Sequence, residues 1–110
     1  MPNVTIFAPE ATLAQSDETY EIFLATCNSL CIDLIRAEPD KVHVIFIQTG
    51  KHAIGNPGYI EVKLRSGGHR TPQLMGEFME KLEVAFGTAF GAKVRIRCFA
   101  YEGKHIFARH

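Results

Sequence analysis

A strand, a helix and a strand follow one another twice along this chain, and this order limits the fold more than any other feature. In the first occurrence, a β-branched and aromatic run at 3–8 precedes a helix that Ser16 can cap. Apolar residues recur along that helix at three- and four-residue steps down to about Ile35. A nearly all-apolar run of strand length follows at 42–48. These patterns predict one β-α-β unit.

The second occurrence begins after a long loop at 50–58, with strict alternation of apolar and polar residues at 59–65. Thr71 can cap the next helix, and Pro72 suits its first position. Alternation returns at 93–99. The two predicted caps, Ser16 and Thr71, are 55 residues apart, which indicates a duplication of pattern although the residues of the two halves differ.

Two such units predict an α+β fold, because right-handed crossovers place both helices on the same side of the strands. We expect a four-stranded mixed sheet with two helices on one face. A chain of 110 residues has room for one hydrophobic core, so the prediction is a single domain over 1–110.

The sheet face opposite the helices is predicted to be mixed in character. Apolar Ile45 and Ile47 would lie there among charged side chains. Such a face suits association between copies, in which buried charges must be paired or line a site. The charged and polar residues expected on this face are His43, Glu61, Lys63, Arg65, Arg95 and Arg97.

Charge and cysteine content exclude several functional classes. Twelve Lys and Arg balance twelve Asp and Glu, so no overall field attracts nucleic acid or an anionic membrane. Cys27, Cys31 and Cys98 fit neither a disulfide framework nor a zinc site, and the five histidines lack metal-binding spacing. We therefore expect no metal. Glycine-rich nucleotide-binding motifs are also missing, so we expect no cofactor. Without a signal peptide or a membrane-spanning run, a cytoplasmic location is expected.

Pro2 is the candidate catalytic residue. It lies between Met1 and a strand that we expect to be central in the sheet. If Met1 is removed, Pro2 becomes a secondary amine on a rigid element, and nearby cations lower the pKa of an amine. Such an amine can act as a general base near neutral pH. A retained Met1 would instead make the Pro2 nitrogen an amide without a basic lone pair.

Met1-Pro2 leading into a strand, the duplicated β-α-β units and the Gly-Gly-x-x-Thr turn at 67–71 together resemble the tautomerase superfamily. In length and layout the chain is similar to the branch with macrophage migration inhibitory factor and 5-carboxymethyl-2-hydroxymuconate isomerase. The resemblance implies a cofactor-independent tautomerase or isomerase of a small 2-oxo carboxylic acid, assembled as a homotrimer. It implies Pro2 as the base and Arg65 and Arg70 as ligands of the substrate carboxylate. Arg97 would reach the pocket of a neighbouring subunit, although its residue type departs from that branch.

Other interpretations stay open at this point. Arg65 and Arg97 can form ion pairs with Glu61 and its neighbours across subunits, and Arg70 can be a solvated turn residue. The scaffold also suits a non-catalytic small-molecule-binding or regulatory module. A hydratase or dehalogenase of an unsaturated acid is a third possibility, for which Glu61 and Glu102 are the candidate carboxylates.

Overall fold

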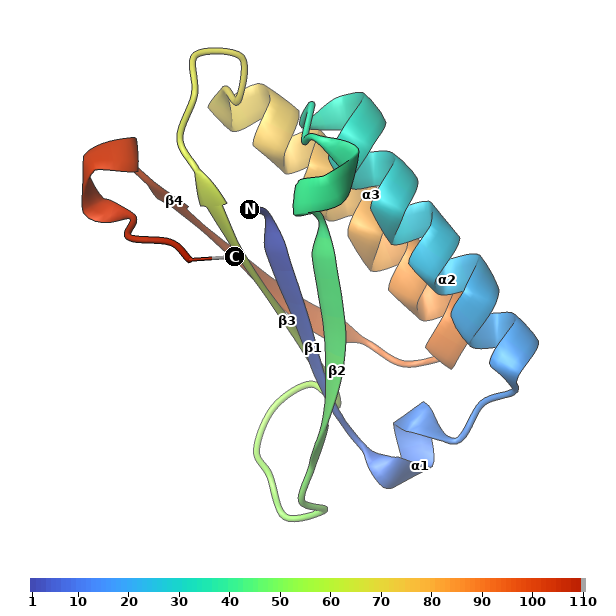
Figure 1. Ribbon diagram of the computed structural model, residues 1–110. Coiled ribbons are helices and arrows are strands. Elements are labelled where there is room, and N and C mark those ends of the chain that lie inside the picture. The colour runs from blue at the N-terminus through green and yellow to red at the C-terminus, as the bar shows by residue number, and fades with distance from the viewer. Residues whose placement is uncertain (110) are drawn as a thin grey trace.

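Two β-α-β units build the molecule, as the hydrophobic pattern predicted (Figure 1). The computed structural model describes residues 1–109. The first unit contains β1 (Asn3–Pro9), α1 (Glu10–Leu13), α2 (Asp17–Ser29), a π-helical turn (Leu30–Leu34), a 3-10 turn (Pro39–Lys41) and β2 (His43–Thr49). The second contains β3 (Gly58–Arg65), α3 (Pro72–Phe90) and β4 (Val94–Tyr101), followed by a 3-10 turn (Gly103–His105).

The four strands form one mixed sheet in the order β2-β1-β3-β4. Within each unit the strands are parallel, β1 to β2 and β3 to β4, whereas the inner strands β1 and β3 are antiparallel. Helices α2 and α3 lie side by side on one face of this sheet (Figure 1). The predicted fold class is therefore confirmed, and β1 is central as expected.

The core lies between the two helices and the covered face of the sheet. Val4 pairs with Val62 across the inner strands, and both are almost completely buried. From the helices, Phe23 of α2 and Phe86 of α3 meet edge-on with ring centroids 6.2 Å apart. No polar or charged residue is buried in the described part of the chain, so apolar packing holds the two layers together.

Both predicted helix caps are present. The Ser16 hydroxyl accepts a hydrogen bond from the Thr19 backbone N–H at 3.2 Å, and the Thr71 hydroxyl accepts one from the Leu74 N–H at 3.2 Å. Each cap satisfies one of the backbone donors that a helix leaves free at its first turn.

The first unit departs from the expected pattern in two places. Residues 10–13, between the first predicted strand and the first predicted helix, form the short helix α1, and the helix expected to reach Ile35 ends as a π-helical turn. Buried Cys27, Cys31 and Ile35 are spaced by four residues, which overruns the 3.6-residue period of an α-helix. The Ile35 N–H bonds to the Leu30 carbonyl at 3.3 Å, five residues back, and this wider turn keeps Ile35 facing the core.

All three cysteines are free thiols. Burial raises the pKa of Cys27 to about 12 and those of Cys31 and Cys98 to about 11. These groups are therefore protonated at neutral pH and act as apolar residues.

None of the helices within residues 1–109 has both the length and the apolar character needed to cross a membrane.

Candidate active site

Pro2 is held firmly at the start of the central strand β1. Its side chain is less than 2% exposed, and its carbonyl accepts a hydrogen bond from the His43 backbone N–H at 3.1 Å. This bond continues the ladder between β1 and β2 by one residue. The ring that precedes the strand is thus buried like the inward-facing residues of the strand, while Met1 is only half-buried.

Met1 borders a cavity of about 380 Å³. Segments that are far apart in the sequence meet there: the connection between α2 and β2, the turn between β3 and α3, and the segment after β4. The cavity is lined by Met1, Arg36, Ala37, Glu38, Lys41, Arg65, Arg70, Ile106 and Ala108. The fold thus brings two of the predicted arginines, Arg65 and Arg70, to the residue that precedes Pro2.

The cavity is strongly cationic. Arg36, Lys41, Arg65 and Arg70 line it, against the single carboxylate of Glu38. Among residues 1–109, none of these four cations forms an ion pair, since every ion pair lies elsewhere: Lys63 with Glu61, Lys81 with Glu77, and Lys104 with Glu102. A concave surface with unneutralised positive charge favours an anionic ligand.

Arg70 is fixed by backbone carbonyls. Its Nε donates to the Ile35 carbonyl at 3.0 Å, and its Nη1 donates to the Arg65 carbonyl. It is half-buried, and this burial lowers its pKa, partly offset by Cys31. Arg70 is therefore an ordered part of the site and not a freely solvated turn residue.

His69 contributes to the same junction. Its Nε2 lies 3.1 Å from the Ile35 carbonyl oxygen, the atom that Arg70 also contacts. The turn before α3 is thereby joined to the end of the π-helical turn. His69 does not line the cavity, so its visible role is to hold Ile35 and its neighbours in place.

Arg97 lies apart from the other predicted residues. In the sheet it pairs with Glu61, which pairs with Thr5, three residues along β1 from Pro2. It lines a different hollow of about 700 Å³ at the other end of the sheet. The residues around that hollow are Ile54, Gly55, Asn56, Gly58, Tyr59, Arg95, Arg97 and Phe99. Within one chain, Arg97 and Pro2 therefore belong to separate sites.

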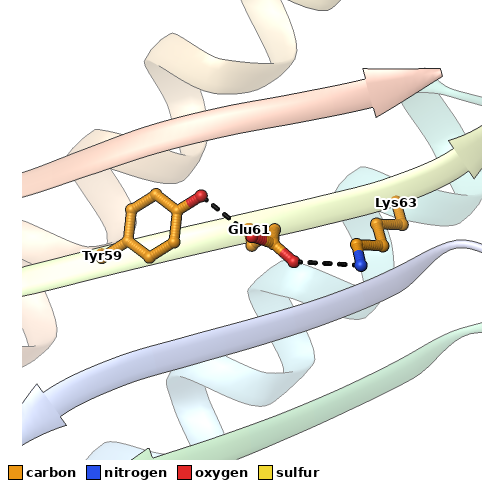
Figure 2. A network of polar contacts seen from close by, with 3 residues as sticks. All are labelled: Tyr59, Glu61 and Lys63. Carbon is orange, nitrogen blue, oxygen red and sulfur yellow. Dashed lines mark hydrogen bonds and ion pairs between the residues drawn. The ribbon is translucent and has the colours of Figure 1, made fainter. Parts of the chain in front are cut away.

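Glu61 is engaged by its neighbours on β3, as Figure 2 shows. The Tyr59 hydroxyl donates to Glu61 Oε2 at 3.0 Å, and Lys63 Nζ lies 3.4 Å from Oε1. Burial, aided by this hydrogen bond, raises the pKa of Tyr59. The ion pairs considered for Glu61 with Arg65 or Arg97 are not formed within the chain.

The carboxylates considered for water activation are both outside the Met1 cavity. Glu61 is on the bare face of the sheet, and Glu102 is exposed and paired with Lys104 at 3.2 Å. No cluster of His, Cys, Asp and Glu in residues 1–109 has the arrangement of a metal site.

Two cavity residues, Arg36 and Lys41, were not singled out from the sequence. Arg36 follows the last apolar position of its helix, where glycine is the usual residue for ending a helix. It has a left-handed backbone with φ 56°. The sequence therefore contained one signal for Arg36, an arginine at a position where glycine is usual.

No protein-family model matches the chain, and no curated protein matches it in sequence. Solved structures do match. A fused 4-OT, wild type, in an asymmetric trimer has a TM-score of 0.80 at 14% identity, covering 96% of this chain and 91% of that one. N1, a member of the cis-3-chloroacrylic acid dehalogenase family, has a TM-score of 0.79 at 16% identity, with coverages of 96% and 79%.

Macrophage migration inhibitory factor of Toxoplasma gondii matches with a TM-score of 0.74 at 16% identity, covering 96% of this chain and 95% of that one. All three neighbours belong to the tautomerase superfamily. The chain therefore has the fold of the tautomerase superfamily, as the resemblance in its sequence implied.

Proposed function

We propose that this protein is a cofactor-independent tautomerase of a small 2-oxo carboxylic acid, with Pro2 as the general base after removal of Met1. One observation carries the proposal. Met1, which is bonded to the Pro2 nitrogen, lines a cavity with four unpaired cations. Loss of Met1 would enlarge the cavity and leave a secondary amine at its wall.

The cationic surroundings suit Pro2 to its role. Positive charges disfavour protonation of an amine, so the four cations would lower the pKa of the Pro2 nitrogen and increase its unprotonated fraction at neutral pH. The free amine would take a proton from the carbon next to the keto group. The electrons of that C–H bond would form the enolate, whose oxygen is then protonated by water, and the hydroxide that remains would take the proton from the Pro2 ammonium. The reverse sequence would convert the enol to the ketone.

Arg65 and Arg70 would bind the substrate carboxylate. The guanidinium of Arg70 is already oriented by the carbonyls of Ile35 and Arg65, so little reorganisation would accompany binding. Arginine also matches the two oxygens of a carboxylate better than lysine does. Apolar Ile106 and Ala108 at the same cavity would limit access of water to the enolate.

We also propose a homotrimer in which Arg97 of one copy reaches the Met1 cavity of another. The bare face of the sheet supports association, because Ile45, Ile47 and Phe99 are each about 40% exposed there. Arg97 has no carboxylate partner among residues 1–109. Three matched 4-OT structures are named as trimers. Light scattering on the purified protein would measure the assembly directly.

Ketonisation of phenylenolpyruvate or 2-hydroxymuconate tests the catalytic proposal. Intact mass must first establish that the purified chain lacks Met1. A positioned general base contributes about 100-fold or more to a rate, so Pro2→Ala should lose at least that factor. Pro9→Ala, at the opposite end of the same strand, is the matched control and should keep its activity. Arg70→Ala should weaken substrate binding.

Equal rates for the wild type and Pro2→Ala would contradict the proposal. An N-terminal extension that acylates Pro2 should also abolish turnover without changing the fold. If the natural host retains Met1, and the protein binds carboxylates without turnover, the scaffold serves as a binding or regulatory module instead.

A further inference from the structure

The outer surface of the helix layer, which faces away from the sheet, is hollowed between α2 and α3. Two adjoining hollows of about 380 and 490 Å³ lie there, and both are lined by Thr26 of α2 and Lys81 of α3. Together they form one groove, which follows α2 and the π-helical turn from Thr19 to Leu34. At the helical rise of about 1.5 Å per residue, this helix groove is about 22 Å long.

The helix groove is apolar and uncovered. Ile22 of α2 and Val84 of α3 line it with 61% and 63% of their surfaces exposed. The rest of the lining includes the buried ring of Phe23 and a set of small residues from both helices. These small residues are Ala25, Thr26, Ala85, Thr88 and Ala89. Small side chains between larger apolar ones leave space for large apolar side chains of another molecule.

The helices that form this groove are strongly acidic. Residues 17–34 and 72–90 contain seven carboxylates and a single cation, Lys81, which is paired with Glu77 at 3.2 Å. The seven carboxylates are Asp17, Glu18, Glu21, Asp33, Glu77, Glu80 and Glu83. Because the whole chain has twelve charged residues of each sign, negative charge is concentrated on the helix layer.

Three of these carboxylates border the helix groove directly. Glu18 precedes Ile22 by four residues, and Glu80 precedes Val84 by four residues. Residues four apart lie on the same face of a helix, so each exposed apolar residue has a carboxylate beside it. Asp33 itself lines the groove near the end of the π-helical turn. The groove therefore combines an apolar centre with a negative rim.

This combination determines the chemistry of a suitable partner. Carboxylates repel phosphate groups, which disfavours nucleic acid and an anionic membrane, and the equally acidic helices of a second copy are disfavoured too. A basic polypeptide is attracted. A groove between two helices accommodates a third helix whose apolar residues recur at three- and four-residue steps. Its length matches a helix of about 15 residues.

We propose that the helix groove binds an amphipathic helix of another protein, with an apolar stripe on one face and Lys or Arg on the other. Large apolar side chains of the partner would lie between Ile22 and Val84, while its cations would pair with Glu18 and Glu80. The bare face of the sheet is on the opposite side of the molecule, so the proposed trimer leaves the groove free (Figure 1). Among residues 1–109, the groove and the Met1 cavity share no lining residue, so binding is independent of the proposed catalysis.

Fluorescence anisotropy of a labelled synthetic peptide tests this inference on the wild-type protein. The probe has about 15 residues of leucine, lysine and alanine, with leucine recurring at three- and four-residue steps. A scrambled peptide of the same composition keeps the charge and loses the apolar stripe. A third peptide with glutamate in place of lysine keeps the stripe and reverses the charge. We expect the basic amphipathic peptide to bind about tenfold more tightly than either control, or better.

Substitutions in the protein locate the binding site. Val84→Lys adds a cation at an exposed position, so the melting temperature should be kept while the peptide affinity falls about tenfold. Ile54→Lys is the matched control, because Ile54 is exposed on the loop between β2 and β3, and it should leave the affinity unchanged. The double variant Glu18→Gln and Glu80→Gln should weaken binding about threefold and reduce its dependence on salt.

Equal affinities for the amphipathic and scrambled peptides would overturn the inference, because the apolar stripe would then play no part. Equal affinity for the acidic peptide would overturn the assigned charge of the partner. An unchanged affinity in Val84→Lys would mean that the peptide binds elsewhere. If light scattering shows an assembly of the wild type that Val84→Lys dissociates, a second copy occupies the groove and the inference also fails.

Discussion

The two β-α-β units share one architecture and differ in the residues at equivalent positions of their helices. Cys27, Cys31 and Ile35 of the first unit correspond, at a separation of 55 residues, to larger Leu82, Phe86 and Phe90 of the second. All six are buried. The second unit ends its helix regularly at Gly91, while the first passes through a π-helical turn to Arg36.

This difference places the larger helix residues in one unit and the irregular helix end, beside the candidate site, in the other. Phe86 and Phe90 contact each other with ring centroids 4.8 Å apart and also pack against Phe23, so the second helix adds two rings to an aromatic cluster that also contains Tyr20 and Phe46 of the first unit. The irregular end of the first unit instead lies beside the Met1 cavity. The unit with smaller core residues is the one whose helix end departs from regular geometry.

Because two buried thiols lie in the core of the first unit, we expect the stability of the protein to fall at alkaline pH. Burial raises the pKa of Cys27 to about 12 and that of Cys31 to about 11. An unfolded chain releases these protons near pH 8.5, so the folded state keeps protons that the unfolded state has lost. The stability from these neutral thiols is complete below about pH 8.5 and is lost as the pH rises toward the folded values. Between pH 8.5 and 10.5, we expect Cys27 and Cys31 together to lower the free energy of unfolding by about 4 kcal/mol, and Cys98 of β4 to add to this loss.

Urea denaturation at pH 7.5, 9 and 10.5 measures this loss. The double variant Cys27→Ala and Cys31→Ala should be less stable at pH 7.5, because it leaves small cavities, but its stability should change much less with pH. Leu82→Ala in the second unit is the matched control, since it loses core volume and keeps the full pH dependence. If the free energy of unfolding of the double variant falls with pH as steeply as that of the wild type, Cys27 and Cys31 are not the cause of the alkaline sensitivity.

A second comparison concerns the starts of the inner strands. Pro2, just before β1, and Gly58, the first residue of β3, are both buried. At Gly58, a Cβ would lie 2.6 Å from Cζ of Phe86 and 3.1 Å from Cγ2 of Val94. The larger core residue of the second unit therefore leaves no room for a side chain at this strand start.

Gly58→Ala should lower the free energy of unfolding by about 2–3 kcal/mol, because neither the Phe86 ring nor β4 can move away without disturbing the core. Equilibrium denaturation would measure this change. In the Phe86→Leu background, where the ring is absent, Gly58→Ala should lower the free energy of unfolding by less than it does in the wild type. Additive effects in this double-mutant cycle would exclude the clash as the cause.

Most of the fold was predictable because it follows from local patterns. Capping by Ser16 and Thr71 and strict alternation at 59–65 are properties of neighbouring residues, and the structure has all of them. The π-helical turn was not predictable in the same way. Four-residue spacing of apolar residues is compatible with an ordinary helix. The wider π-helical turn forms because Ile35 packs into the core, which the sequence pattern does not show.

The candidate site was predictable in part for a related reason. Pro2, Arg65 and Arg70 stand at the start or end of elements that the pattern located, and the antiparallel pairing of β1 with β3 brings those ends together. Arg36 and Lys41 come from the connection after α2, whose path depends on the hydrogen bonds from His69 and Arg70 to Ile35. Contacts across 34 and 35 residues leave no periodic trace in a sequence.

The smallest expected effect comes from substituting the two left-handed residues. Gly91→Ala should lower the free energy of unfolding by about 1 kcal/mol through backbone strain alone, since no atom lies within 4 Å of the added Cβ. Arg36→Gly should raise it by about 1 kcal/mol, because it relieves the corresponding strain. Gly76→Ala, in open space within α3, controls for glycine replacement in general and should be stabilising.

Opposite signs at Arg36 and Gly91 in matched urea titrations would mean that the first unit gives up stability for its arginine. A destabilised Arg36→Gly would mean that the arginine side chain supports the fold.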